Sequence, residues 1–267
     1  ELGIPFSDPT AEGPVIQNAN LRALSGGITT DKIFSFVREL RKDVTVPMVF
    51  MTYANVVFSY GAERFISACK EIGIDGLILP DLPFEEKEEF QPICKQYDVA
   101  LISLIAPTSE NRIAMIAKEA EGFIYLVSSL GVTGTRNEIT TDLTSIVKVI
   151  RENSNIPCAI GFGISTPEQA KKMATISDGA IVGSAIIKLL EKHGKDAPQY
   201  IGEYVKKMKE FADKGYWAAD SISSQATRDE DFVAGKTAIM TWNLSTVANR
   251  TVEMNAANPD WNATLLD

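Results

Sequence analysis

Six short, almost continuous apolar runs alternate with polar segments of helical spacing along the first part of the chain. The runs cover residues 47–53, 76–81, 99–105, 122–128, 157–163 and 179–185. The spacing of apolar residues predicts helices at 61–73, 85–97, 109–119, 141–153, 166–175 and 199–213. Strands that are apolar on both faces are typical of a parallel sheet buried under helices. The pattern therefore predicts six βα units in a row.

Six units are two short of a closed (β/α)8 TIM barrel, so we expect a barrel that is incomplete at its N-terminus. Glu1 already stands inside a segment that reads as strand, which suggests a cut start. An open barrel leaves strand edges unpaired and one side of the core uncovered. We therefore divide the chain into a barrel, residues 1–211, and a tail, residues 212–267.

The tail differs in composition from the barrel. It is rich in Ser, Thr, Asn and Ala, and it holds all three tryptophans. Its pattern predicts a strand at 237–242, a helix at 244–257 and a short strand at 263–266. This βαβ unit could complete the barrel if one of its strands paired with 47–53 or 179–185. Residues 231–240 also resemble a stretch of extracellular solute-binding lipoproteins, which would make the chain a fusion, or chimera.

The net charge and the cysteines indicate which classes of partner and which cellular compartment to expect. The net charge of -9 offers no attraction for nucleic acid or for an anionic membrane. No apolar stretch approaches the roughly 20 residues that span a bilayer. Cys69, Cys94 and Cys158 are odd in number and lie among aliphatic residues, so we expect buried thiols and a reducing, cytoplasmic setting.

Two glycine turns follow the last two apolar runs, Gly161-Phe162-Gly163 and Gly183-Ser184. In TIM barrels the loops after the last two strands commonly bind phosphate through backbone amides, and glycine lets the anion approach closely. A single turn of this kind more often serves tight packing. Two at successive strand ends favour a phosphate site.

Acidic residues surround the turn at the start of the chain. Glu1 and Asp8 lie on either side of a rigid turn, and Glu12 follows shortly. A partly desolvated carboxyl group at a strand end can exchange protons near neutral pH. From these residues alone, the alternative that they are solvated loop acids stays open. The terminal ammonium beside the Glu1 carboxyl should lower its pKa, and fraying of the chain start should loosen the site, so we expect little activity. His193 lies in a basic helical stretch, and we expect a surface residue and not a catalyst.

Six motifs in order resemble the tryptophan synthase alpha subunit over residues 1–211. They are ELGIPFSDPTAEGP at 1–14, MTYAN at 51–55, YLVS at 125–128, GVTG at 131–134, GFGI at 161–164 and GSAI at 183–186. The resemblance implies the retro-aldol cleavage of indole-3-glycerol phosphate to indole and glyceraldehyde 3-phosphate, in tryptophan biosynthesis. It implies no metal and no organic cofactor for this lyase reaction.

The resemblance also assigns roles to residues. Glu1 matches the general acid/base, and Glu12 matches the carboxylate that holds the indole N–H, where the family usually has Asp. The expected substrate-binding residues are Tyr53, Tyr125, the lid residue Thr133, and the phosphate-binding Gly134, Phe162, Gly163, Gly183 and Ser184. The loops around Pro9 and Asn55 match the surface that docks on the pyridoxal-phosphate beta subunit. A beta-subunit partner is therefore implied.

Two other readings stay open at this point. The chain could be an inactive chimeric barrel that keeps only its phosphate site. It could also be a solute-binding module, an interpretation that rests on the tail alone.

Overall fold

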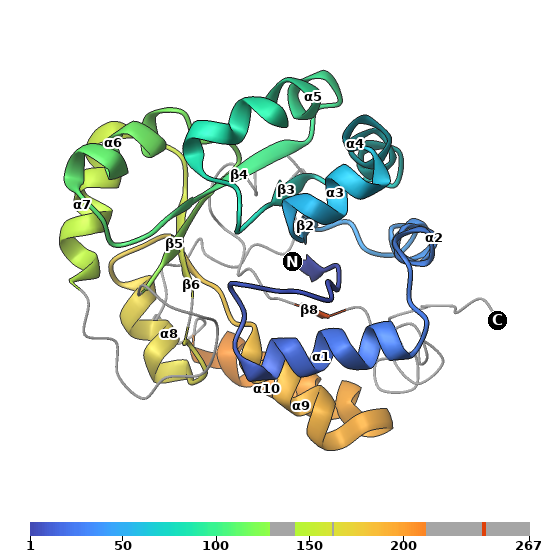
Figure 1. The fold of residues 1–267 in the computed structure, drawn as a ribbon. Helices are drawn as coiled ribbons and strands as arrows, with labels where there is room; N and C mark the ends of the chain where they lie inside the picture. The colour runs from blue at the N-terminus through green and yellow to red at the C-terminus, as the bar shows by residue number, and fades with distance from the viewer. Residues whose placement is uncertain (129–141, 162, 212–241, 244–267) are drawn as a thin grey trace.

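A curled parallel sheet is the centre of the molecule (Figure 1). The computed structural model describes residues 1–128, 142–161, 163–211 and 242–243. The strands are β1 Leu2–Gly3, β2 Val49–Met51, β3 Gly76–Ile78, β4 Ala100–Ile105, β5 Ile124–Val127, β6 Cys158–Gly161, β7 Gly179–Ala180 and β8 Trp242–Asn243. They are ordered β7-β6-β5-β4-β3-β2-β1-β8, and every pair is parallel. The described strands form an open sheet of the TIM-barrel type, as predicted.

Helices surround the outer face of this sheet. They are α1 Pro14–Ser25, α2 Thr30–Leu40, α3 Ala54–Tyr60, α4 Ala62–Glu71, α5 Gln91–Gln96, α6 Glu110–Lys118, α7 Leu143–Asn153, α8 Pro167–Ala174, α9 Ser184–His193 and α10 Ala197–Phe211, with the 3-10 helices η1 Phe84–Glu89 and η2 Gly194–Asp196. The single helix expected at 85–97 is wrong, because η1 and α5 occupy that segment separately. Pro92 explains the break, since a helix continued from η1 would bring its ring against an earlier carbonyl.

All six predicted runs are longer than the strands they contain, and for two of them the reason is clear. The run 76–81 contributes only β3, because Pro80 has no N–H for a ladder and the Leu82 N–H turns back to the Leu79 carbonyl at 3.1 Å. The run 179–185 contributes only β7, because α9 already begins at Ser184. Each shortened strand leaves a loop at the carboxyl end of the sheet, where barrels carry their active sites.

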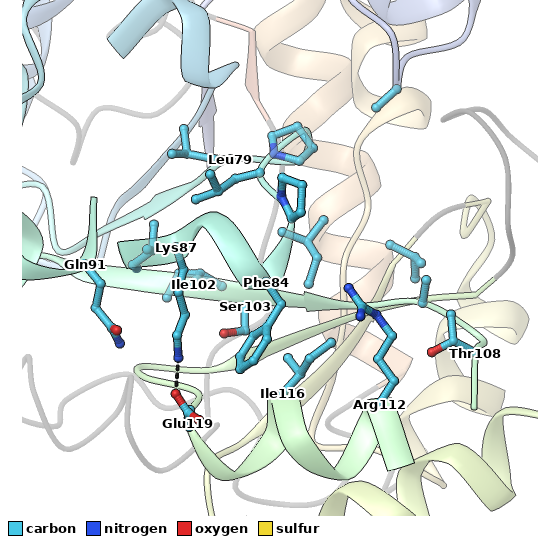
Figure 2. A pocket seen from close by; sticks show the side chains of 18 residues that line it. Leu79, Phe84, Lys87, Gln91, Ile102, Ser103, Thr108, Arg112, Ile116 and Glu119 are labelled. Atoms are coloured by element: carbon cyan, nitrogen blue, oxygen red, sulfur yellow. Dashed lines mark hydrogen bonds and ion pairs between the residues drawn. The ribbon is translucent and has the colours of Figure 1, made fainter. Parts of the chain in front are cut away.

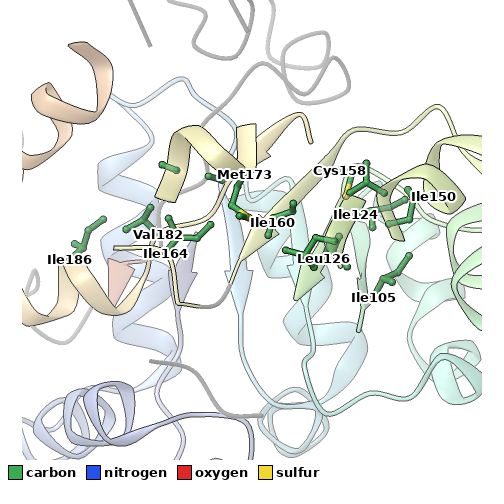
Figure 3. Close-up of a cluster of buried hydrophobic side chains, with 14 of the residues drawn as sticks. Ile105, Ile124, Leu126, Ile150, Cys158, Ile160, Ile164, Met173, Val182 and Ile186 are labelled. Carbon is green, nitrogen blue, oxygen red and sulfur yellow. The ribbon is translucent and has the colours of Figure 1, made fainter. Parts of the chain in front are cut away.

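The core has two layers, one on each face of the sheet. Inside the curl, alternate residues of the strands pack together, including Val49, Ile78 and Ile102. Outside it, larger aliphatic clusters join the sheet to the helices, and Figure 3 shows one of them around Ile124 and Ile160. All three cysteines are buried and free, as predicted, and belong to these outer clusters.

Carboxylates brace the amino-terminal end of the sheet at two places. Asp75, before β3, accepts the Met48 N–H at 2.8 Å and returns its own N–H to the Met48 carbonyl at 2.8 Å. Asp178, before β7, makes the same pair of bonds with Cys158, at 2.9 and 2.8 Å. We call such a pair of bonds between an aspartate and the main chain a bracket, and each bracket joins the beginnings of two neighbouring strands.

Of the tail, the structure describes only β8, which pairs with β1. The expected pairing with 47–53 is wrong for this strand, because β1 already occupies that edge of β2. The strand begins at Trp242, where the prediction for 237–242 ended. The helix expected at 244–257, the strand expected at 263–266 and the solute-binding resemblance at 231–240 lie outside the described residues.

Candidate active site

Glu1 precedes β1, which is held beside β2 in parallel register. The residue is partly exposed as a whole, but each carboxyl oxygen exposes less than 1 Å². Burial raises the pKa of the Glu1 carboxyl to about 7, and the ammonium of the same residue lowers it by less. The ammonium lowers the pKa, as expected, but desolvation is the larger effect, so the net shift of the Glu1 pKa is upward.

Glu12 lies in the loop between β1 and α1 and is only 8% exposed. The Tyr53 hydroxyl donates a hydrogen bond to its carboxylate and accepts one from the Ala11 N–H at 2.8 Å. Burial raises the pKa of Glu12, the bond from Tyr53 lowers it, and the negative charge of Asp81 raises it. Like Glu1, this residue is a buried acid with a raised pKa, and not a solvated loop acid.

Tyr125 reaches the same interior from β5. It is 4% exposed, and burial, followed by the charge of Glu1, raises its pKa well above the ordinary value for tyrosine. Its ring lies against Gly161 on β6, where an added Cβ would come within 2.5 Å of the tyrosine hydroxyl oxygen. Gly161 is therefore required by this close approach. The structure thus places Glu1 and Tyr125 within electrostatic reach of each other.

The two glycine turns lie at the carboxyl ends of neighbouring strands, because β6 pairs with β7. Gly163 has φ +90°, a backbone region that glycine enters freely. Gly183 precedes α9, whose first residue, Ser184, is 9% exposed. The first amides of a helix have no acceptor within it and are suited to an anion.

Other predicted residues have different positions. Thr133, Gly134 and Phe162 lie outside the described residues. Pro9 is partly buried and Asn55 is exposed, and they follow β1 and β2 at the carboxyl end of the sheet. His193 ends α9 and stacks on Tyr200 with ring centroids 3.5 Å apart, so it is only partly exposed.

A cavity of about 320 Å³ adjoins the loop that carries Glu12 (Figure 2). It lies between η1, β4 and α6, and Ala11 is its contact with that loop. Its polar rim includes Lys87, paired with Glu119, and Arg112, paired with Glu85. None of the predicted site residues in the described part of the chain lines this cavity.

Sequence reasoning missed Asp81, which acts on Glu12 through its charge and binds the main chain beside Tyr53. The signal that could have found it is its place directly after the apolar run of β3. Side chains at that point of a parallel sheet gather at one edge.

Comparison with known proteins agrees with this geometry. A sequence model described as Tryptophan synthase alpha chain matches residues 1–215. The chain is 49% identical over 213 residues to the tryptophan synthase alpha chain of Lacticaseibacillus casei, covering 80% of each chain. It is 50% identical over 214 residues to that of Lactiplantibacillus plantarum, covering 80% of this chain and 81% of the relative.

The chain belongs to the tryptophan synthase alpha chain family. It is accordingly a lyase of the type found in tryptophan biosynthesis.

Solved structures support the same family assignment. The tryptophan synthase subunit alpha of Campylobacter jejuni is 39% identical with a TM-score of 0.64, over 71% of this chain and 76% of that one. The tryptophan synthase complex of Pyrococcus furiosus contains a chain that is 31% identical with a TM-score of 0.71, over 78% of this chain and 84% of that one. Within the described residues, no helix is long and apolar enough to cross a membrane.

Proposed function

We propose that this tryptophan synthase alpha family member cleaves indole-3-glycerol phosphate to indole and glyceraldehyde 3-phosphate. The observation that supports this most is the pair of buried acids on either side of β1, Glu1 before the strand and Glu12 in the loop after it. A carboxyl group with a pKa of about 7 is close to half protonated at neutral pH, so it can both give and take a proton.

In the proposed reaction Glu1 gives its proton to the indole carbon that bears the glycerol chain. Positive charge then develops on the ring nitrogen, and the Glu12 carboxylate accepts a hydrogen bond from the N–H there. Glu1, now a carboxylate, takes the proton of the neighbouring chain hydroxyl, and the carbon–carbon bond breaks to leave an aldehyde and neutral indole. Protons and charges balance, and Glu1 ends in the form in which it began.

We assign the remaining roles to the groups around these acids. Tyr125 lines the cleft beside Glu1, and Tyr53 holds Glu12. The extra methylene of Glu12, relative to the usual Asp, is accommodated by its bond to Tyr53. The amides around Gly163, Gly183 and Ser184 would bind the phosphate, together with Phe162 and Gly134, and Thr133 would belong to the lid.

A beta-subunit partner is part of the proposal. The loops of Pro9 and Asn55 lie at the mouth of the barrel, and the relative from Pyrococcus furiosus was solved in a tryptophan synthase complex. Co-elution of the full chain with a tryptophan synthase beta subunit, weakened by Asn55→Arg, would test this surface. We keep a cytoplasmic location as a prediction.

The test is indole release from indole-3-glycerol phosphate, measured with and without beta subunit. Glu1→Gln should lower kcat/KM on the order of 10³-fold, because it removes the proton donor. The matched control is Glu88→Gln on exposed η1, which should change nothing. Glycerol phosphate binding without any turnover by the unaltered chain would instead identify an inactive barrel with a phosphate site.

A further inference from the structure

Asp81 caps a helix that belongs to a different βα unit. It follows β3, yet its carboxylate oxygens accept the N–H of Ala54, the first residue of α3, at 2.9 and 3.3 Å. Tyr53 is the N-cap residue of α3, and its side chain makes no capping bond there. The carboxylate that an N-cap residue usually supplies comes here from the neighbouring strand.

The end of β3 holds the main chain on both sides of Tyr53. On one side the Thr52 N–H bonds to the Ile78 carbonyl at 3.1 Å, and on the other the Ala54 N–H bonds to Asp81. The Tyr53 hydroxyl in turn contacts the Glu12 carboxylate and the Ala11 N–H. A short chain of contacts therefore runs from Asp81 through Tyr53 to the loop of Glu12.

We propose that Asp81 is a positioning residue: by fixing the start of α3, it holds the Tyr53 hydroxyl against the Glu12 carboxyl group. The consequence for turnover rests on the proposed function, whereas the structural coupling does not. Within the described part of the chain, the Asp81 carboxylate bonds to the Ala54 N–H and not to Glu12, so its positioning effect acts through Tyr53.

Asp81 has a second, electrostatic effect on the same group. In the described part of the chain, the groups that act on the Glu12 carboxyl are the Tyr53 hydroxyl and the Asp81 carboxylate. The negative charge of Asp81 disfavours a second negative charge on Glu12 and raises its pKa. Two substitutions separate these effects. Asp81→Asn keeps an acceptor for the Ala54 N–H but removes the charge, and Asp81→Ala removes both.

The direct experiment is a carboxyl 13C NMR titration of the full chain labelled at glutamate, with the Glu12 signal assigned by its loss in Glu12→Gln. In Asp81→Asn the Glu12 midpoint should fall by about 0.5 pH unit, since a nearby like charge is gone. Glu88→Gln removes an equal charge from exposed η1 and should leave the midpoint unchanged. A midpoint in Asp81→Asn equal to that of Glu88→Gln would overturn the electrostatic coupling.

Kinetics test the positioning role. Asp81→Ala should lower kcat for indole release roughly tenfold with KM nearly unchanged, because the Tyr53–Glu12 pair loses a support worth one charge-assisted hydrogen bond. Asp81→Asn should restore kcat to within about threefold, because an amide oxygen can still accept the Ala54 N–H. Equal kcat in the two variants would overturn positioning. If the unaltered chain released no indole, the proposed function would fail, while the NMR titration would still decide whether Asp81 acts on Glu12.

Discussion

Two carboxylates in different regions of the sheet have opposite roles. Inside the curl, where Glu1 precedes β1 and acts on Tyr125, burial raises the pKa of Glu1 to about 7. At the amino end, Asp75 lies against Arg41, with 2.5 Å between Oδ2 and Nη2, and both side chains are largely buried, at 16% and 11% exposure. Burial that outweighs nearby charges makes the Glu1 carboxyl group a proton donor near neutral pH, whereas burial with a guanidinium and a main-chain amide makes the Asp75 carboxylate a brace. What surrounds the carboxyl decides its role.

The largest effect on stability should come from Asp75→Ala. This change leaves Arg41 buried without its carboxylate and the Met48 N–H without its acceptor, so the free energy of unfolding should fall by about 3 kcal/mol. Urea denaturation would measure it. Because Asp75 lies at the amino end of the sheet, away from the Glu12 loop and the glycine turns, kcat of the folded fraction should change less than about twofold.

Asp75→Asn is the matched control, because it keeps an acceptor for the Met48 N–H and loses only the charge. Its loss of stability should be smaller than that of Asp75→Ala. If both variants unfolded at the urea concentration of the unaltered chain, Asp75 would contribute nothing to stability. The contrast between Glu1 as an acid and Asp75 as a brace would then fail.

The dependence of the free energy of unfolding on pH tests the raised pKa of Glu1. A carboxyl whose pKa rises from 4.5 to about 7 on folding binds its proton more tightly in the folded state. Below pH 4.5 both states are protonated and nothing is lost. Between pH 4.5 and 7 the unfolded state ionises first, so the free energy of unfolding falls, by about 3 kcal/mol in total, and above pH 7 it stays level.

Glu1→Gln removes this dependence because an amide does not ionise. Relative to the unaltered chain, the variant should gain no stability at pH 4 and up to about 3 kcal/mol at pH 8. The raised pKa of Glu12 is common to both proteins and cancels in the difference. A gain that was the same at both pH values would show that the Glu1 carboxyl is not titrating near neutrality, and it would remove the physical basis for its role as acid and base.

These residues also show how much of the fold and of the site could be predicted from the sequence. Apolar runs predicted β2 to β7 because a buried parallel strand must be apolar on both faces. The resemblance at residues 1–14 assigned Glu1 and Glu12 to the site. The helix α1 was missed because only Ala19, Asn20 and Ala23 of it are buried, which leaves a weak amphipathic pattern. The pKa of Glu1 was misjudged because the sequence shows the adjacent ammonium but not the amount of burial.

The contacts that cross between βα units were not predictable in the same way. Asp81 and Asp75 are ordinary loop acids in the sequence, and their roles depend on which main-chain amide a neighbouring strand or helix brings to them. That pairing depends on which strands are neighbours and on the path of each loop, and the hydrophobic spacing within one strand does not show either.

The smallest effect should come from Asp178→Ala, at the second bracket of the amino end. Asp178 repeats the geometry of Asp75, but its arginine, Arg151, is 54% exposed and the aspartate 34%, with 3.1 Å between Nη2 and Oδ1. Because solvent screens this pair, its removal should cost mainly the bond to the Cys158 N–H, about 1 kcal/mol. Urea denaturation at low salt and at 1 M salt separates the contribution of the ion pair from that of the main-chain bond. The loss of unfolding free energy in Asp178→Ala should hardly depend on salt. A loss as large as that of Asp75→Ala would mean that the shared main-chain bracket, and not the burial of the arginine, gives the amino end its stability.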